Sequence, residues 1–138
     1  MLNLETLLRV PDVDSLAGFN ISPDGFRLAF AWNKTGQWEI YELSLDVGQI
    51  ANLPITVGSS GPGGKFGPRY SPNGKHLAWA LDLNGSESFH IVLCNLTTGE
   101  TRDLTPDIDF VIQPSFAWSP DGQQIAYLAD KAGNFDLY

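Results

Sequence analysis

A four-residue motif, Ser-Pro-Asp/Asn-Gly, occurs at residues 22–25, 71–74 and 119–122, and it constrains the fold of this chain more than any other feature. Pro presets φ at the second position of a tight turn, Asp or Asn tolerates the third, and Gly takes the positive φ that closes the turn. Apolar, strand-like stretches flank each copy. Each copy therefore predicts a β-hairpin.

The spacing of the copies indicates tandem repeats. From Ser22 to Ser71 is 49 residues, and from Ser71 to Ser119 is 48. The similarity continues past the turn, because Trp-Glu-Ile-Tyr at 38–41 aligns with Phe-Asp-Leu-Tyr at 135–138. A self-similar period of about 20–50 residues is typical of solenoids, propellers and related arrays.

Four short strands per repeat is the pattern of one propeller blade. In the first repeat, alternating apolar residues between turn signals predict strands over 19–22, 27–32, 38–43 and 49–53. The sequence therefore predicts an all-β fold made of β-propeller blades of four antiparallel strands. It holds about three consecutive blades, of which the last is incomplete by one strand. The partial propeller is assigned to 17–138, and its blades to 17–53, 67–105 and 113–138.

The opening residues, 1–16, form a separate lead-in. Leu4, Leu7 and Leu8 share one helical face, so we predict a short N-terminal helix that ends before Pro11. We expect this helix to lie against the first sheet or against another domain. It lacks the basic leader, the long apolar run and the small-residue cleavage site of a signal peptide.

Bulk composition argues against several classes of partner. The formal net charge of −8 argues against binding nucleic acid or an anionic membrane surface. No stretch approaches ~18 consecutive apolar residues, so no membrane span is expected. The single cysteine, Cys94, follows an apolar run and is expected to be a buried thiol without a disulfide partner. We therefore expect a reducing, cytoplasmic location.

No catalytic, cofactor-binding or metal-binding residue is predicted. The sequence lacks the Gly-x-Ser-x-Gly elbow of an α/β-hydrolase. Ser22, Ser71 and Ser119 recur once per blade, whereas a nucleophile is needed once per active site, so we interpret them as turn residues. His76 and His90 have no second His at metal-ligand spacing and are interpreted as ordinary strand or surface residues.

The remaining motifs are assigned to turns and loops. The Gly-rich stretch 58–65 departs from the phosphate-binding pattern at both of its ends, and we predict a flexible loop between blades. The stretch 82–87 stops before it supplies the oxygen series of a calcium loop, so a solvated turn is predicted. Four Asn-x-Ser/Thr patterns are also interpreted as turn elements; they begin at Asn20, Asn33, Asn84 and Asn95.

The repeat resembles the propeller repeats of the prolyl oligopeptidase family, with the acylaminoacyl-peptidase branch the closest match. The resemblance covers 17–138 and rests on Ser-Pro-Asp-Gly-x-x-Leu-Ala-Phe at 22–30, the partner strand 38–41 and the ending 98–105. The lead-in 4–10 is similar to the start of such peptidases. Similar TolB-type, WD40-like repeats occur in periplasmic TolB proteins and in tricorn-like proteases, although the Gly-His and Trp-Asp signatures of WD blades are missing.

The resemblance implies a segment that scaffolds and gates substrate access in a serine peptidase. In that family the propeller covers an α/β-hydrolase domain, which holds the whole Ser-Asp-His triad. These residues lack that domain, so catalysis is expected of a parent protein and not of the segment alone. The expected partners are the hydrolase domain, the remaining blades and peptide substrate. Two other readings stay open: a non-catalytic TolB-like binding module, and a small β protein that self-associates through open sheet edges.

Overall fold

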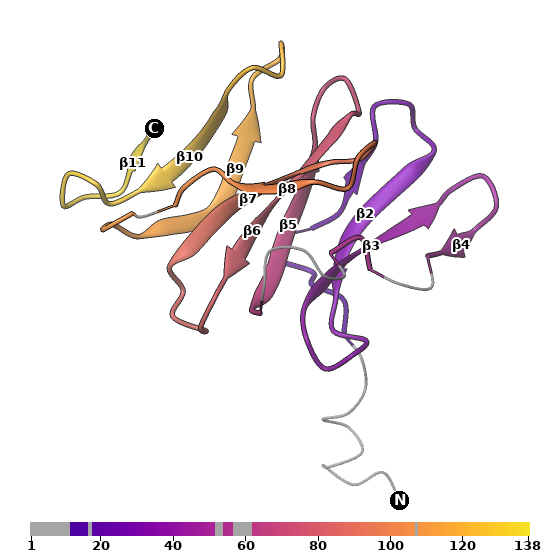
Figure 1. The fold of residues 1–138 in the computed structure, drawn as a ribbon, viewed down its shortest axis with the longest axis horizontal. Coiled ribbons are helices and arrows are strands. Elements are labelled where there is room, and N and C mark those ends of the chain that lie inside the picture. Colours follow the sequence, from indigo (N-terminus) through magenta and orange to yellow (C-terminus); the bar gives the residue numbers. More distant parts are fainter. Residues whose placement is uncertain (1–11, 17, 52–53, 57–61, 107) are drawn as a thin grey trace, which may run out of the picture.

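The structure, a computed structural model, describes residues 12–16, 18–51, 54–56, 62–106 and 108–138. All regular secondary structure in these ranges is β, in three antiparallel sheets of four, four and three strands. The sheets stand side by side, and within each sheet the strands follow one another in chain order (Figure 1). This arrangement is that of propeller blades. The helix predicted before Pro11 lies outside the described residues.

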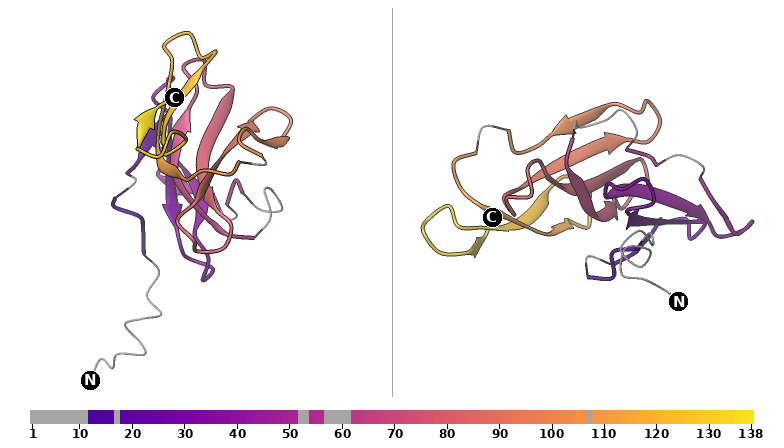
Figure 2. Two further views of the ribbon diagram at one scale, coloured as in Figure 1. Left: turned by 90° about the vertical axis from the view of Figure 1, so that its left-hand side faces the viewer. Right: turned by 90° about the horizontal axis from the view of Figure 1, so that it is seen from below.

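Each sheet corresponds to one sequence repeat. The first sheet contains β1 (Asn20–Ile21), β2 (Arg27–Trp32), β3 (Glu39–Ser44) and β4 (Gln49–Ile50). The second contains β5 (Gly64–Tyr70), β6 (His76–Asp82), β7 (Phe89–Asn95) and β8 (Thr101–Asp103). The third contains β9 (Ile112–Trp118), β10 (Ile125–Ala129) and β11 (Asp136–Leu137). The right-hand view of Figure 2 shows the second sheet between the other two.

The Gly-rich stretch is less of a loop than predicted. Residues 57–61 lie outside the description, but Gly64 and Lys65 already belong to β5. The prediction of a flexible loop is therefore wrong for these two residues. Contacts across the boundary between sheets explain the difference, because the Lys65 N–H donates to the Trp38 carbonyl at 3.0 Å and the Lys65 side chain is buried.

The recurring Ser-Pro-Asp/Asn-Gly motif builds the same hydrogen-bonded turn in every sheet. In the second sheet, the Gly74 N–H donates to the Ser71 carbonyl at 2.8 Å, and Gly74 has φ +68°. The Asn73 side chain accepts from the Lys75 N–H at 3.0 Å. The Ser71 hydroxyl accepts from the His76 N–H at 3.0 Å. The predicted hairpins are therefore confirmed, and the side chains of the motif complete the backbone bonding of each turn.

Apolar clusters fill the seams between neighbouring sheets, which we name seam 1–2 and seam 2–3. In seam 1–2, Ala29 of the first sheet packs with Leu77 and Trp79 of the second, all fully buried. In seam 2–3, Ala78 of the second sheet packs with Phe116 of the third. Because side chains alternate across a strand, β6 presents large residues to one neighbouring sheet and alanines to the other.

Polar side chains join the sheets at the same seams. The Tyr70 N–H donates to the Asn20 side-chain oxygen at 2.7 Å, and the Tyr70 hydroxyl donates to Glu42 at 2.6 Å across seam 1–2. Across seam 2–3, the Trp118 indole N–H donates to the Arg69 carbonyl at 3.2 Å. Each bond joins residues at least 28 positions apart in the sequence, so together they fix how the repeats stack.

Candidate functional site

The recurrent serines are structural in this fold. Ser22 and Ser71 are 3% and 1% exposed, and each hydroxyl is held within its own turn. Ser119 is less buried but keeps the matching bond, accepting from the Gln124 N–H at 2.9 Å. Each serine hydroxyl also donates to the Asp or Asn two residues later. The prediction that these serines are turn elements is confirmed.

The two histidines occupy different environments. Nδ1 of His90 lies 2.7 Å from a carboxylate oxygen of Asp103, on the partly exposed face of β7 and β8. The other oxygen of Asp103 accepts from the Thr105 N–H at 2.8 Å, so this carboxylate is fixed on both sides. His76 begins β6 and borders a groove. Within the described ranges, no group of three or more His, Cys, Asp and Glu side chains could hold a metal ion.

Two further predictions concern single buried groups. Cys94 is 3% exposed, and burial raises the pKa of its thiol, so the predicted buried thiol is confirmed.

Asp82 opens the turn 82–87 that was predicted to be solvated, but its side chain is 8% exposed. It accepts from the N–H groups of Asn84 and Ser86 at 3.3 and 3.1 Å. That part of the prediction is wrong, because the turn folds its own N–H groups over the carboxylate.

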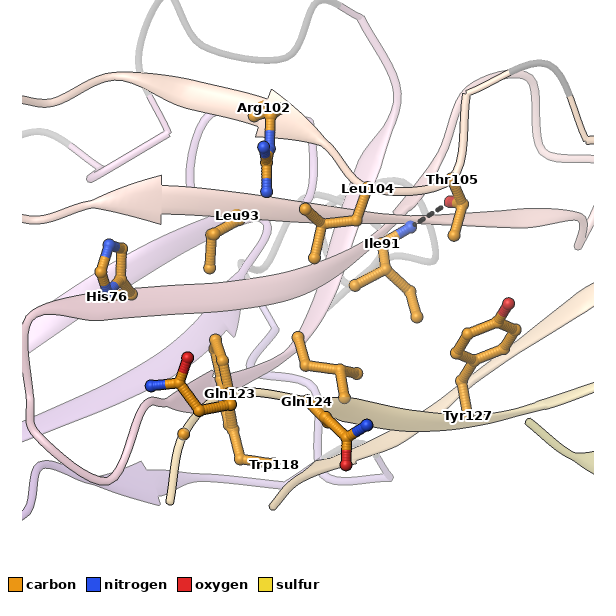
Figure 3. A pocket seen from close by; sticks show the side chains of 12 residues that line it. His76, Ile91, Leu93, Arg102, Leu104, Thr105, Trp118, Gln123, Gln124 and Tyr127 are labelled. Atoms are coloured by element: carbon orange, nitrogen blue, oxygen red, sulfur yellow. Dashed lines mark hydrogen bonds between the residues drawn. The ribbon is translucent and has the colours of Figure 1, made fainter. Parts of the chain in front are cut away.

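A groove of about 380 Å³ between the second and third sheets is the first of two candidate binding sites. We name it the sheet 2–3 groove, and Figure 3 shows side chains from both sheets pointing into it. The second sheet contributes His76, Ile91, Leu93, Arg102, Leu104 and Thr105. The third contributes Trp118, Gly122, Gln123, Gln124, Ile125 and Tyr127. The groove is therefore lined by apolar side chains together with polar and basic ones.

The charges at the groove differ from those of the whole chain. Arg102 of β8 and His76 of β6 line it, and the lining residues include no Asp or Glu. The Thr105 hydroxyl has a structural role, because its oxygen accepts a hydrogen bond from the Ile91 N–H at 2.9 Å. The whole chain has a net charge of −8, but this groove carries no negative side chain. A ligand carboxylate would therefore meet the Arg102 guanidinium there without repulsion from another lining residue.

The place in seam 1–2 that corresponds to the sheet 2–3 groove is filled by polar side chains. The repeat alignment places Arg27 at the position of His76, Glu42 at that of Leu93, and Tyr70 at that of Trp118. Arg27 lies 3.6 Å from Glu42 and stacks over the Tyr70 ring at 5.2 Å. Burial raises the pKa of Tyr70, and the hydrogen bond that its hydroxyl donates to Glu42 and the negative charge of Glu42 raise it further. Sequence reasoning missed this contrast, although aligning the repeats position by position could have found it.

A second hollow of about 360 Å³ lies beside the first strands of the second and third sheets. Phe66 of β5 and Phe89 of β7 form its aromatic wall, with ring centroids 6.2 Å apart. Arg69 of β5 supplies a guanidinium group, and its Nη1 donates to the Pro68 carbonyl at 2.8 Å. The other lining residues are Asp14, Leu16, Pro114 and Ser115. In a closed ring of blades, first strands line the central passage.

The described part of the chain thus shows stacked antiparallel sheets and grooves between them, and it is a β-propeller segment. No family model matches the sequence. The chain is 31% identical to dipeptidyl-peptidase 5 of Porphyromonas gingivalis, covering 87% of this chain and 18% of that protein. It is 28% identical to the uncharacterized peptidase YuxL of Bacillus subtilis, covering 88% and 19%. The chain spans about a fifth of the length of these curated relatives.

Solved structures give the same relationship. TolB from Acinetobacter baumannii superposes with a TM-score of 0.68 at 25% identity, covering 92% of this chain and 29% of that one. The acylaminoacyl peptidase of Pyrococcus horikoshii superposes with a TM-score of 0.61 at 14% identity, covering 92% and 18%, and shows the shared fold. The chain is therefore a propeller segment related to those of the dipeptidyl-peptidase 5 and YuxL peptidases, acylaminoacyl peptidase and TolB. No helix among the described residues is long and apolar enough to cross a membrane.

Proposed function

We propose that this segment belongs to the propeller of a serine peptidase of the prolyl oligopeptidase type. There it scaffolds an α/β-hydrolase domain supplied by the parent protein and gates the access of peptides to it. The observation that carries the proposal is the 31% identity to dipeptidyl-peptidase 5 over 87% of this chain. The similar coverage of a second peptidase, YuxL, supports it.

The geometry is compatible with a gate. Stacked blades leave an axial passage that admits an extended peptide and excludes a folded protein. The hollow beside β5 and β9 offers Phe66 and Phe89 to apolar side chains of a peptide. Under this proposal the partners are the remaining blades, the hydrolase domain and peptide substrate, and the location is the cytoplasm.

The test compares the 138-residue chain with the parent protein. We expect an active-site fluorophosphonate to label the parent at its hydrolase domain and to leave the chain unlabelled, because the chain lacks the Gly-x-Ser-x-Gly elbow and its recurrent serines, Ser22, Ser71 and Ser119, are turn residues. Turnover by the parent should fall steeply as peptide substrates lengthen, since long or folded substrates cannot pass the propeller. A parent that is not labelled, or that cleaves folded proteins as readily as short peptides, would contradict the proposal.

Opening seam 1–2 tests gating separately from catalysis. Lys65→Ala in the parent removes one side of the buried ion pair to Glu39. We expect turnover of long peptides to rise relative to that of a dipeptide substrate, because a loosened seam widens the route to the active site. Asp24→Ala, which removes the exposed partner in the Arg27–Asp24 pair within the first sheet, is the matched control. An equal change for long and short substrates would argue against gating.

The second candidate function is a non-catalytic module that binds a protein or peptide. The TM-score of 0.68 to TolB, against 0.61 to acylaminoacyl peptidase, favours it. The two functions separate cleanly in one experiment. A parent that is not labelled by fluorophosphonate but retains a protein or peptide on an affinity column supports the binding module.

A further inference from the structure

The chain contains two Asn-Gly sequences, and they lie in turns of different construction. Asn84-Gly85 lies in the turn between β6 and β7, and Asn73-Gly74 lies in the Ser-Pro-Asn-Gly turn between β5 and β6. An asparagine followed by glycine deamidates without an enzyme when both residues are free to move. Glycine permits the reaction because it has no side chain to keep its own backbone nitrogen away from the asparagine amide.

The Gly85 N–H makes no hydrogen bond with any of the described residues. The repeat alignment places Gly36 of the first sheet and Gly133 of the third at the position of Gly85. Both of these donate to the residue that opens their turn: Gly36 to the Asn33 carbonyl at 2.9 Å, and Gly133 to the Asp130 carbonyl at 2.7 Å. The second sheet has therefore lost a backbone bond that its neighbours keep.

The side chain of Asp82, which opens the turn of the second sheet, explains this loss. Its carboxylate accepts from the N–H groups of Asn84 and Ser86, which lie on either side of Gly85. Asn84 and Gly85 are exposed, and no hydrogen bond among the described residues holds the Asn84 amide side chain. A Cβ built at Gly85 would meet nothing within 4 Å. The Asn84 side chain and the next backbone nitrogen therefore have room to approach each other.

The turn at Asn73 holds the corresponding groups in place. The Asn73 side-chain oxygen accepts from the Ser71 hydroxyl at 2.9 Å and from the Lys75 N–H at 3.0 Å. The Gly74 N–H donates to the Ser71 carbonyl at 2.8 Å. A Cβ built at Gly74 would lie 3.6 Å from Cδ of Pro23, so the first sheet also limits movement there. Reaction at Asn73 therefore requires local opening of the turn.

We propose that Asn84 is a site of spontaneous deamidation in the folded chain, and that the Ser-Pro-Asn-Gly turn protects Asn73 from the same reaction. The Gly85 nitrogen gives its proton to solvent and attacks Cγ of Asn84, which forms a new C–N bond. The bond from Cγ to the amide nitrogen breaks, and that nitrogen takes up a proton and leaves as ammonia. Water then opens either side of the resulting succinimide ring.

The products are an aspartyl or an isoaspartyl residue at position 84. Either product replaces a neutral amide with a carboxylate, so the exposed turn gains a negative charge. In the isoaspartyl product the backbone runs through the side-chain carbonyl, and the free α-carboxylate is the group that an isoaspartyl-specific carboxyl methyltransferase esterifies. None of these steps needs the proposed parent protein or its hydrolase domain, so failure of the proposed function leaves the reaction unaffected.

Peptide mapping by mass spectrometry measures both sites in one sample of the 138-residue chain. During incubation of the folded chain at mildly alkaline pH, we expect Asn84 to convert at least about tenfold faster than Asn73, because only the Asn73 turn must open first. In urea, where neither turn is folded, the two rates should become similar. Methyl labelling by the isoaspartyl-specific methyltransferase should increase in parallel with conversion at Asn84.

Three variants separate the chemistry from the fold. Asn84→Gln should remove most of the methyl labelling, because attack on the longer side chain closes a larger and less favourable ring. Ser71→Ala removes a hydroxyl that holds Asn73 and should speed conversion at Asn73 without changing the rate at Asn84. Ser119→Ala is the matched control, because it removes the equivalent hydroxyl from the third sheet and should change neither rate.

The comparison of the wild-type chain with and without urea needs no variant, so it decides the question even if Ser71→Ala does not fold. The proposal is overturned if Asn84 stays intact in the folded chain, or if Asn73 converts as fast as Asn84. It is also overturned if the ratio of the two rates is no larger in the folded chain than in urea. A folded Ser71→Ala chain with an unchanged rate at Asn73 would exclude the turn as the source of protection.

Discussion

Nζ of Lys65, on β5, lies 2.9 Å from a carboxylate oxygen of Glu39, on β3, so an ion pair joins the first two sheets. The Lys65 side chain is 2% exposed and that of Glu39 is 12% exposed. The Thr56 hydroxyl donates to the other oxygen of Glu39. A buried charge needs such partners, because leaving water is costly for it. The pair therefore specifies how these two sheets are aligned.

Removing one member of this pair should destabilise the chain strongly. Lys65→Ala leaves Glu39 buried beside an empty space, and breaking a buried pair in this way costs about 3–5 kcal/mol. The free energy of unfolding from urea titration should fall by about that amount. Lys65→Met combined with Glu39→Leu should recover most of the loss, because two apolar side chains of similar size replace two charges.

The more exposed Arg27–Asp24 pair supplies the control for that measurement. Its atoms lie 3.4 Å apart, and the Asp24 side chain is 49% exposed. Exposed ion pairs contribute little to stability, so Asp24→Ala should lose little through the ion pair itself, although Asp24 also accepts from the Phe26 N–H. If the double variant at Lys65 and Glu39 is no more stable than Lys65→Ala, the ion pair is not the source of the loss.

The motif serines should differ in their energetic contribution, although their sequence context is the same. Ser71 is 1% exposed and its hydroxyl bonds to Asn73 and to both backbone groups of His76. Ser71→Ala should cost about 1–3 kcal/mol, because it removes a buried hydroxyl and leaves the His76 N–H without its acceptor. Ser119→Ala should cost less, since water can replace the hydroxyl at that half-buried turn. Equal losses in thermal unfolding would show that burial does not control the cost.

Much of the fold follows from the turn motif and its period. The hairpins around Ser22, Ser71 and Ser119 and the strand 27–32 were predictable, because turn chemistry and alternation are local signals. Contacts between repeats were not predictable in this way. The burial of Lys65 depends on Glu39, which lies 26 residues earlier, and no local pattern marks that partnership. A lysine in a Gly-rich stretch is therefore read as exposed loop when only its neighbours are considered.

The grooves were missed for a related reason. The predicted absence of a catalytic motif concerned single residues, whereas the sheet 2–3 groove arises from a difference between repeats. Leu93 takes the place that Glu42 occupies in the first repeat, and Trp118 takes that of Tyr70. Leu93 and Trp118 cannot form the hydrogen bond that joins Glu42 and Tyr70 and closes seam 1–2. Predicting the groove needs the repeat alignment together with the packing of one sheet on another, and only the first is in the sequence.

The turn glycines should respond unequally to a methyl group. Gly25 and Gly122 have positive φ values of +79° and +69°, so Ala at either position is strained by about 1–2 kcal/mol. A Cβ at Gly25 would meet nothing within 4 Å, whereas at Gly122 it would lie 3.3 Å from Cδ of Pro72. Gly122→Ala should therefore cost more than Gly25→Ala in urea unfolding. The reverse order would show that the turns of neighbouring sheets do not pack as described.

The chain should lose stability at alkaline pH. Burial raises the pKa of Cys94, and burial together with Glu42 raises that of Tyr70. In the unfolded chain these groups ionise near about 8.5 and about 10. The unfolded state therefore releases protons first, and it binds fewer protons than the native state as the pH rises. The free energy of unfolding should be flat to about pH 8 and should fall above it.

Two variants separate the contributions to this loss. Cys94→Ala should delay the start of the fall, because the first group to ionise in the unfolded chain is gone. Tyr70→Phe should lower stability at neutral pH by about 1–3 kcal/mol, since it removes the bond to Glu42. Above about pH 10 it should make the fall shallower without abolishing it, because burial also raises the pKa of Tyr41. Urea titrations from pH 6 to about pH 11 measure both effects, and a Tyr70→Phe curve that parallels the wild type above pH 10 would exclude Tyr70 as the titrating group.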